Sequence, residues 1–369
     1  MTFPRSSRVG RAVCVLATLA MAWAAARLCV WLHTPIPWMI GPLLATALAS
    51  LAGAPTASWT PLRNTGQWVI GTALGLYFTP QVGALVASLW WVIVLGIVWA
   101  LLLGLGFDRW LQRVHARHLP GLSAGELRAT TYFSGAIGGA SEMTLLAERA
   151  GARTDLVASA HSLRVLLVTL CLPFGMLFWG VTGLDLAPPA VRDVAWPGLG
   201  LLALLTLAGA VLAQWLGRAN PWFMGALLVT MGITLSGQVW SALPPELSYA
   251  AQLVIGVSLG VRFTPDFLHT APRWLGSVAL ASVVMMVLCA AFGWGLSRMI
   301  GMHPATMVLG TAPGGIAEMS ITAKVLQLGV PVVTAFQVCR LVAVLVLAEP
   351  VYRLWVVRQQ QRRHKAGVE

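Results

Sequence analysis

The sequence predicts an all-α, polytopic integral membrane protein, and three observations support this fold class. First, 58% of the 369 residues are hydrophobic and only 10% are charged, with a mean hydropathy of +0.79. Second, apolar segments of helical length follow one another along the whole chain. Third, four motifs recur in the same order in the second half. Soluble domains carry about a quarter charged residues, so we expect the bilayer to be the solvent.

We expect about twelve transmembrane or re-entrant helices. The first runs from Ala12 to about Leu32 after Arg5, Arg8 and Arg11, and is long enough to be an uncleaved first helix. The other apolar segments cover residues 36–53, 66–79, 85–107, 129–148, 156–181, 196–217, 220–236, 249–263, 275–298, 303–327 and 331–355. No remaining stretch is large enough for a soluble domain, so we expect a single membrane domain.

The net charge of +12 comes from basic residues in short connections, chiefly the loop at 108–128 and the C-terminal tail. Positive charge in short loops is typical of the cytoplasmic side of a membrane. We therefore expect a multi-pass protein of the bacterial cytoplasmic (inner) membrane, with both termini in the cytoplasm. The lipid bilayer is then the main partner, and no direct contact with nucleic acid is expected.

The residues that commonly carry catalysis or bind metal show no telling pattern. All five cysteines lie in apolar segments without CxxC or metal-ligand spacing. Neither an exposed nucleophile with a base nor a cluster of metal ligands can be recognised. We expect no enzyme, no cofactor and no metal site.

Four motifs predict a tandem duplication. PWMIG at 37–41 recurs as PWFMG at 221–225, and QWVIGTALGLYFTP at 67–80 recurs as QLVIGVSLGVRFTP at 252–265. GGASEM at 138–143 matches GGIAEM at 314–319, and HSLRV at 161–165 matches QVCRL at 337–341. A shared composition would not keep four motifs in register. We expect a first membrane repeat at 1–195, a second at 196–357, and a basic cytoplasmic tail at 358–369; parallel and inverted arrangements both remain open.

Several segments favour broken helices over continuous ones. Segment 66–79 is short, and segments 129–148 and 303–327 carry GAIGGA and GTAPGG in their interiors. A broken helix that lines a protein cavity frees backbone groups for a ligand. Interrupted segments at corresponding places in two halves indicate a binding site.

A repeated glutamate and arginine are the strongest functional candidates. Glu142 and Glu318 follow the glycine pairs, and Arg164 and Arg340 lie in the next apolar segment. Charges at hydrocarbon depth are costly, so their repetition favours function. Each Glu and Arg is equidistant from the polar turn between two helices, about 16 Å along each, which is half of a hydrocarbon core of about 30 Å. We therefore expect two Glu–Arg pairs near the midplane.

In the functional interpretation, the glutamates bind a coupling proton or cation and the arginines hold an anionic group or supply a counter-charge. The glycine pairs would let backbone approach the ligand and expose a helix N-terminus. In the structural interpretation, each pair only clamps a helical hairpin. His161 and Gln337 lie one turn before the arginines, where they serve either proton relay or hydrogen bonding. The complete candidate set is Gly138, Gly139, Glu142, His161, Arg164, Gly314, Gly315, Glu318, Gln337 and Arg340.

The duplicated PWxxG, QxxIGxxLGxxFTP and GGxxEM motifs closely resemble the AbrB family of bacterial membrane proteins, from about Pro35 to Trp355. That resemblance implies a membrane duplication and a label of AbrB-type transcriptional regulator or ammonia monooxygenase regulator. The soluble DNA-binding protein that shares the AbrB name is a small β-rich domain, and no such segment is found here.

Two functions of different class follow. The first is a secondary transporter or exchanger of a small solute, such as an anion with a coupling proton. The second is a membrane-embedded regulator of gene expression, acting through a partner on the 108–128 loop or the tail. The oligomeric state is left open, with a homodimer as one option.

Overall fold

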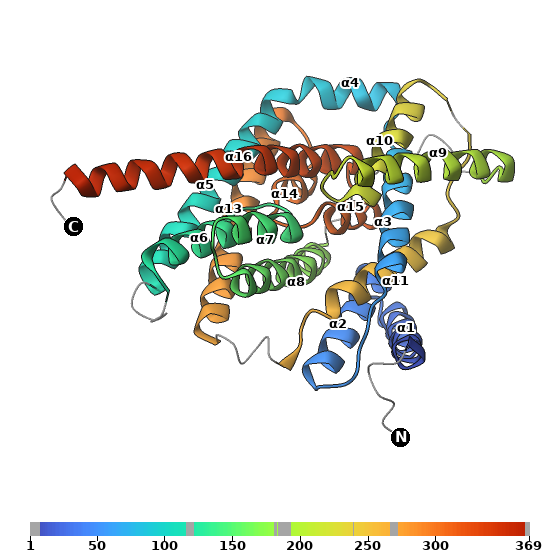
Figure 1. The fold of residues 1–369 in the computed structure, drawn as a ribbon. Coiled ribbons are helices and arrows are strands. Elements are labelled where there is room, and N and C mark those ends of the chain that lie inside the picture. Colours follow the sequence, from blue (N-terminus) through green and yellow to red (C-terminus); the bar gives the residue numbers. More distant parts are fainter. Residues whose placement is uncertain are drawn as a thin grey trace.

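The computed structural model describes residues 8–115, 122–180, 183, 193–238, 240–265 and 272–365 (Figure 1). Within these ranges it contains fifteen helices and no strand. The all-α prediction is therefore confirmed for the described part of the chain. The first seven residues and the centre of the 108–128 loop lie outside the described residues, and the side chains of the basic tail do as well.

The first half contains eight helices. They are α1 (Arg8–Trp31), α2 (Pro37–Leu51), α3 (Thr60–Gly75), α4 (Pro80–Ser88), α5 (Trp90–His115), α6 (Ala124–Gly135), α7 (Ala140–Arg149) and α8 (Thr154–Phe178). Proline occupies one of the first two positions of α2, α3 and α4, where its missing N–H leaves no bond unmade.

The second half contains seven described helices. Its helices are α9 (Trp196–Trp215), α10 (Pro221–Leu235), α11 (Pro245–Gly260), α13 (Pro272–Ile300), α14 (Pro304–Thr311), α15 (Ile316–Val325) and α16 (Val330–Lys365). Proline again opens α9, α10, α11 and α14. The backbone of α16 stays helical through residues 358–365, so the predicted tail begins inside this helix.

Six of the described helices are long and apolar enough to cross a membrane, and a seventh span results if α3 and α4 are counted together. The expected number of about twelve is not confirmed. The shortfall has a physical origin: segments 36–53 and 220–236 form helices of only 15 residues, and segments 129–148 and 303–327 are each split into two short helices. The chain has the character of a membrane protein, with short and broken helices between its long ones.

Helices of the two halves pack directly against each other. Helix α2 lies against α11 of the other half, and α10 lies against α3. The glycines of the IGxxLG motifs permit this approach, because a Cβ at Gly71 would overlap the carbonyl oxygen of Phe223 and one at Gly256 would overlap that of Met39. Glycines four residues apart thus allow two helices to pack closely.

Helix α16 lies at the centre of the molecule. Its apolar part, Val330–Leu354, is 61% buried, against 17–39% for the other five long spans. Figure 1 shows it running through the middle of the fold, with α14 and α15 beside it. The largest buried cluster joins side chains from both halves around these helices. The second glutamate motif is therefore held by the most buried part of the protein.

Candidate functional site

Both glutamate motifs lie where a helix is broken. Helix α6 ends at Gly135 and α7 begins at Ala140, while α14 ends at Thr311 and α15 begins at Ile316. The residue after each first helix, Ala136 or Ala312, leaves the helical conformation with ψ near 133° or 142°. Such a break leaves carbonyls without partners on one side and N–H groups on the other. The expectation of broken helices at these glycine-rich segments is confirmed.

In the first half, Arg164 and His161 of α8 bind the carbonyls that end α6. The Arg164 guanidinium donates to Ser134 O at 3.3 Å and to Ala136 O at 3.0 Å. His161 Nε2 lies 2.8 Å from Phe133 O, and His161 Nδ1 lies 2.7 Å from Arg164 Nη2. A carbonyl only accepts and a guanidinium only donates, so Nε2 carries the ring proton and Nδ1 accepts. Both ring nitrogens are engaged, as in a neutral, fixed imidazole.

In the second half, Arg340 and Gln337 of α16 play the same part at the end of α14. Arg340 donates to Ala312 O, to Gly314 O at 2.7 Å and to Gln337 Oε1 at 2.6 Å. The Gln337 amide donates in turn to Leu309 O at 2.7 Å and Ala312 O at 3.1 Å. His161 and Gln337 thus serve the same purpose, since each hydrogen-bonds to backbone carbonyls at the end of a broken helix.

The arginines therefore cap the C-terminal ends of α6 and α14. The carbonyl end of a helix carries partial negative charge, which a guanidinium compensates while it also supplies donors. The expected Glu–Arg pairs do not form: the ion pairs of the described residues are Arg153–Asp155 and Arg353–Glu349. Equal distances from the turn did not bring the opposite charges together, because the unpaired carbonyls of the broken helices bind the arginines instead.

The glutamates lie on the other side of each break. Glu142 and Glu318 lie in the first turn of α7 and α15, three residues after the N-cap glycines Gly139 and Gly315. Each carboxylate folds back over its glycine, where an added Cβ would overlap Glu Oε2. A carboxylate at this position faces the positive end of the helix dipole.

The first glycine of each pair has a different neighbour. A Cβ at Gly138 would lie 2.8 Å from the terminal methyl of Met143, and one at Gly314 would lie 2.9 Å from Met319 Cγ. In GGxxEM, the first glycine therefore makes room for the methionine and the second for the glutamate. The motif encodes the local shape of the break.

Arg262 was not among the predicted site residues, yet it is the cation that interacts electrostatically with both Glu142 and Glu318. It directly follows α11, in the second FTP-containing motif, where the first motif carries Tyr77. A lone arginine that departs from its repeat partner was the signal that could have identified it. Among the described residues, no group of His, Cys, Asp and Glu could hold a metal ion.

Comparison with known proteins gives a consistent family. A family model described as "Transition state regulatory protein AbrB" matches residues 38–356. An Escherichia coli (strain K12) protein named "Putative regulator AbrB" is 28% identical over 326 residues, covering 87% of this chain and 90% of that protein. A Bacillus subtilis (strain 168) protein named "Uncharacterized protein YhjN" is 27% identical over 351 residues, covering 86% of this chain and 87% of the relative.

Proposed function

Because the chain belongs to the AbrB family of helical membrane proteins, we propose that it is a secondary transporter or exchanger of a small solute. The observation that carries this proposal is the pair of broken helices in the centre of the fold. At each break, a glutamate lies in the first turn of one helix, and an arginine from the following helix caps the end of the other. Discontinuous helices of this kind form substrate and coupling-ion sites in known transporter folds.

The proposal includes a duplication, with residues 1–195 and 196–357 as two membrane repeats and the two breaks as equivalent parts. It is supported by the matched helix order, by the exchange of α2 and α10 between the halves, and by the same capping at both breaks. Pairs of related halves that move against each other give the alternating access that secondary transport needs.

The glutamates are the groups that we assign to coupling. Glu318 is buried and Glu142 is half-buried, and both interact electrostatically with Arg262. A buried carboxylate that can be protonated or paired with a cation is costly for structure alone and useful for coupling. Arg164 and Arg340 hold the geometry of the breaks in this proposal, and do not bind the solute themselves.

The membrane orientation remains part of the proposal. Charge bias places the protein in the bacterial cytoplasmic membrane with both termini inside, since the 108–128 loop and the tail are the most basic connections. The neighbouring described residues agree with an exposed loop, because Ser123 and Glu126 form a solvent-facing capping box at the start of α6.

A membrane-embedded regulator is the second candidate, and the name of the Escherichia coli relative favours it. In that function, the chain would sense a solute or partner and affect expression indirectly. Deleting residues 358–369 would then change expression of target genes, while the protein would carry no solute across a membrane.

The transport proposal is tested with purified protein in sealed vesicles under an imposed proton gradient. Uptake of organic anions and of ammonium is compared for wild type, Glu142→Gln, Glu318→Gln and the control Glu349→Gln, whose carboxylate pairs only with Arg353 near the surface. Gln keeps the size and hydrogen bonding of Glu but removes the charge. We expect wild-type flux that the first two variants lose and the control keeps; an absence of flux for every solute would contradict the proposal.

A further inference from the structure

A cleft of about 600 Å³ lies beside the first break, between α7, α8 and the residues that follow α11. This volume is within the range of small-molecule sites. Six of the eight residues that line it carry a polar or charged side chain. The lining comprises Ala140, Ser141, Thr144, Asp155, Ala158, Ser159, Ser162 and Arg262.

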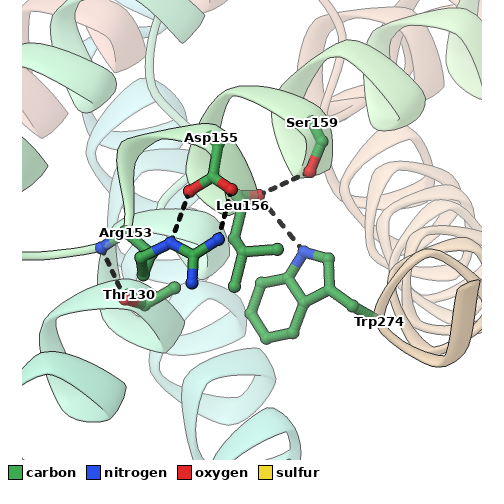
Figure 2. Close-up of polar contacts among 6 residues, drawn as sticks. All are labelled: Thr130, Arg153, Asp155, Leu156, Ser159 and Trp274. Carbon is green, nitrogen blue, oxygen red and sulfur yellow. Dashed lines mark hydrogen bonds and ion pairs between the residues drawn. The ribbon is translucent and has the colours of Figure 1, made fainter. Parts of the chain in front are cut away.

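Two charged side chains line the cleft, and only one of them has its charge paired within the described residues. Figure 2 shows a bidentate ion pair between Arg153 and Asp155. Arg153 Nε lies 2.9 Å from Asp155 Oδ1, and Arg153 Nη2 lies 2.6 Å from Asp155 Oδ2. Arg262 interacts with Glu142 and Glu318 at longer range, but forms an ion pair with neither. The cleft therefore presents the positive charge of Arg262 to whatever enters it.

The hydroxyl groups of the lining come from α7 and α8. Asp155, Ser159 and Ser162 follow one another along one face of α8, which over seven residues extends about 10 Å inward from the polar turn. This face is not the one that carries His161 and Arg164. Ser141 and Ser162 have no hydrogen bond to another described residue, so both can donate to a ligand.

Two further hydroxyls in the lining already donate to backbone. Thr144 Oγ1 donates to Ala140 O at 2.7 Å, and Ser159 Oγ donates to Leu156 O at 2.9 Å, as Figure 2 shows for Ser159. The same Leu156 carbonyl also accepts from the indole of Trp274 at 3.2 Å. These bonds hold the α8 wall in place, which leaves Ser141, Ser162 and Arg262 as the ligand-directed groups.

The corresponding positions of the other half lack this set. Tyr77 stands for Arg262, Val338 for Ser162, Ala335 for Ser159 and Pro331 for Asp155. Tyr77, Pro331 and Ala335 are buried, and Val338 is half-buried. A polar surface needed only for packing of the hairpin would be needed in both halves. Its restriction to an open cleft in one half points to a ligand.

We propose that this cleft binds a small solute through an oxyanion group, a carboxylate or a phosphate. Arg262 holds two of its oxygens, because a guanidinium matches such groups in a bidentate fashion. Ser141 and Ser162 donate hydrogen bonds to the same group. The proposal rests on the transport function above and names its substrate class.

The test measures binding separately from transport. Purified full-length protein in phosphatidylcholine nanodiscs is titrated with succinate and with inorganic phosphate at constant ionic strength, and the heat of binding is recorded. We expect one of these probes to bind wild type. Its affinity should be about tenfold weaker in Arg262→Gln and about threefold weaker in Arg262→Lys, because lysine keeps the charge but cannot bind two oxygens in the planar, bidentate geometry of a guanidinium. Arg218→Gln removes an equal charge from an exposed turn and serves as the matched control.

A second variant keeps the result interpretable if Arg262→Gln fails to fold. Ser162→Val introduces the residue that the other half already carries and is expected to weaken binding without lowering the melting temperature. Equal affinity in wild type, Arg262→Gln and Ser162→Val would overturn the proposal. Loss of binding only in nanodiscs that contain phosphatidylglycerol would show that a lipid headgroup occupies the cleft. That result would overturn the proposal that the ligand is a small solute.

The two proposals can fail independently. Binding that depends on Arg262 without any flux in sealed vesicles would contradict transport and leave the oxyanion site standing. Glutamate-dependent flux that is unchanged in Arg262→Gln and Ser162→Val would leave transport standing and contradict the site.

Discussion

Glu142 is half-buried at the start of α7, whereas Glu318 is only 8% exposed at the start of α15. Every residue from Ile316 to Ala323 is buried, but in α7 only Met143 and Ala147 are. At both breaks, nevertheless, an arginine of the following long helix donates to backbone carbonyls at the end of the first short helix. The comparison teaches that the GGxxEM motif and its arginine build the break, while the neighbouring residues decide whether that break faces an open cleft or a packed core.

The difference assigns separate tasks to the halves. In the second half, Thr334 Oγ1 donates to Ser320 Oγ at 2.9 Å in a fully buried position. At the equivalent place in the first half, Thr144 and Ala158 line the cleft. We infer that the second break is the rigid, buried element and that the first one meets the ligand.

Removing an arginine cap should have the largest effect on stability. Arg164→Ala and Arg340→Ala each leave buried carbonyls unpaired, which costs about 1 to 3 kcal/mol for each group. We expect Arg340→Ala to lower the free energy of unfolding by about 3 kcal/mol or more, and Arg164→Ala by less, because α7 can relax toward the cleft. Denaturant unfolding in detergent measures both. Equal losses would break the comparison between a packed and an open half.

Substituting the N-cap glycines should have the next largest effect. An Ala Cβ at position 139 or 315 would displace the glutamate that folds over it. Glu142 is half-buried and its neighbours in α7 are mostly exposed or half-buried, whereas Glu318 is buried among buried neighbours. We therefore expect Gly315→Ala to lower the free energy of unfolding by about 2 kcal/mol, which reduces the melting temperature by several degrees. Gly139→Ala should reduce the melting temperature by less than half as much. A larger drop for Gly139→Ala would contradict this assignment.

The equivalent hydroxyls at positions 144 and 320 sharpen the comparison at smaller scale. Ser320→Ala removes a buried hydroxyl that hydrogen-bonds to Thr334, whose hydroxyl also bonds to Val330 O, and should cost about 1 kcal/mol of the free energy of unfolding. The Thr144 hydroxyl donates to Ala140 O on its own helix. Because Ala also has the higher helix propensity, Thr144→Ala should change the free energy of unfolding by less than about 0.5 kcal/mol. Paired thermal melts under identical conditions compare the two variants.

The smallest expected effect concerns the pH dependence of the start of α6. The backbone N–H and hydroxyl of Ser123 hold the pKa of Glu126 below its ordinary value of 4.5. Because the folded-state pKa is lowered, this stabilisation is present above pH 4.5 and is lost as pH falls through the lowered value. Helix α14 begins without a carboxylate in its first turn. Glu126→Gln should therefore slightly flatten the acid side of the melting-temperature profile, and an unchanged profile would show that the box does not stabilise the start of α6.

Much of the fold could be predicted from the sequence. The apolar segments located the helices because burial in lipid demands continuous hydrophobicity, and the glycine-rich interiors located both breaks. The expected number of about twelve transmembrane or re-entrant helices was not confirmed, since 15-residue helices such as Pro37–Leu51 have the composition of a span but are shorter than one. Apolar composition alone does not distinguish a short buried helix from a crossing one.

The contacts of the candidate site residues could not be predicted from the sequence. Matched distances from a turn placed Glu142 and Arg164 at similar depth, and opposite charges suggested that they would pair. The sequence does not reveal that the last carbonyls of α6 compete for the guanidinium, because this depends on where the helix breaks and how α8 packs on it. Arg262 was missed because its partners lie on other helices, and only the departure from Tyr77 marks it.

The central claim is that the two capped breaks carry a solute across the membrane. It is tested most directly by gradient-driven uptake into sealed vesicles that contain wild-type protein, compared with vesicles that contain the Glu142→Gln and Glu318→Gln double variant. We expect uptake of an organic anion into the vesicles with wild-type protein. In vesicles with the double variant, we expect uptake no higher than in vesicles without protein. Uptake at background level in both, with correctly folded wild-type protein, would contradict it.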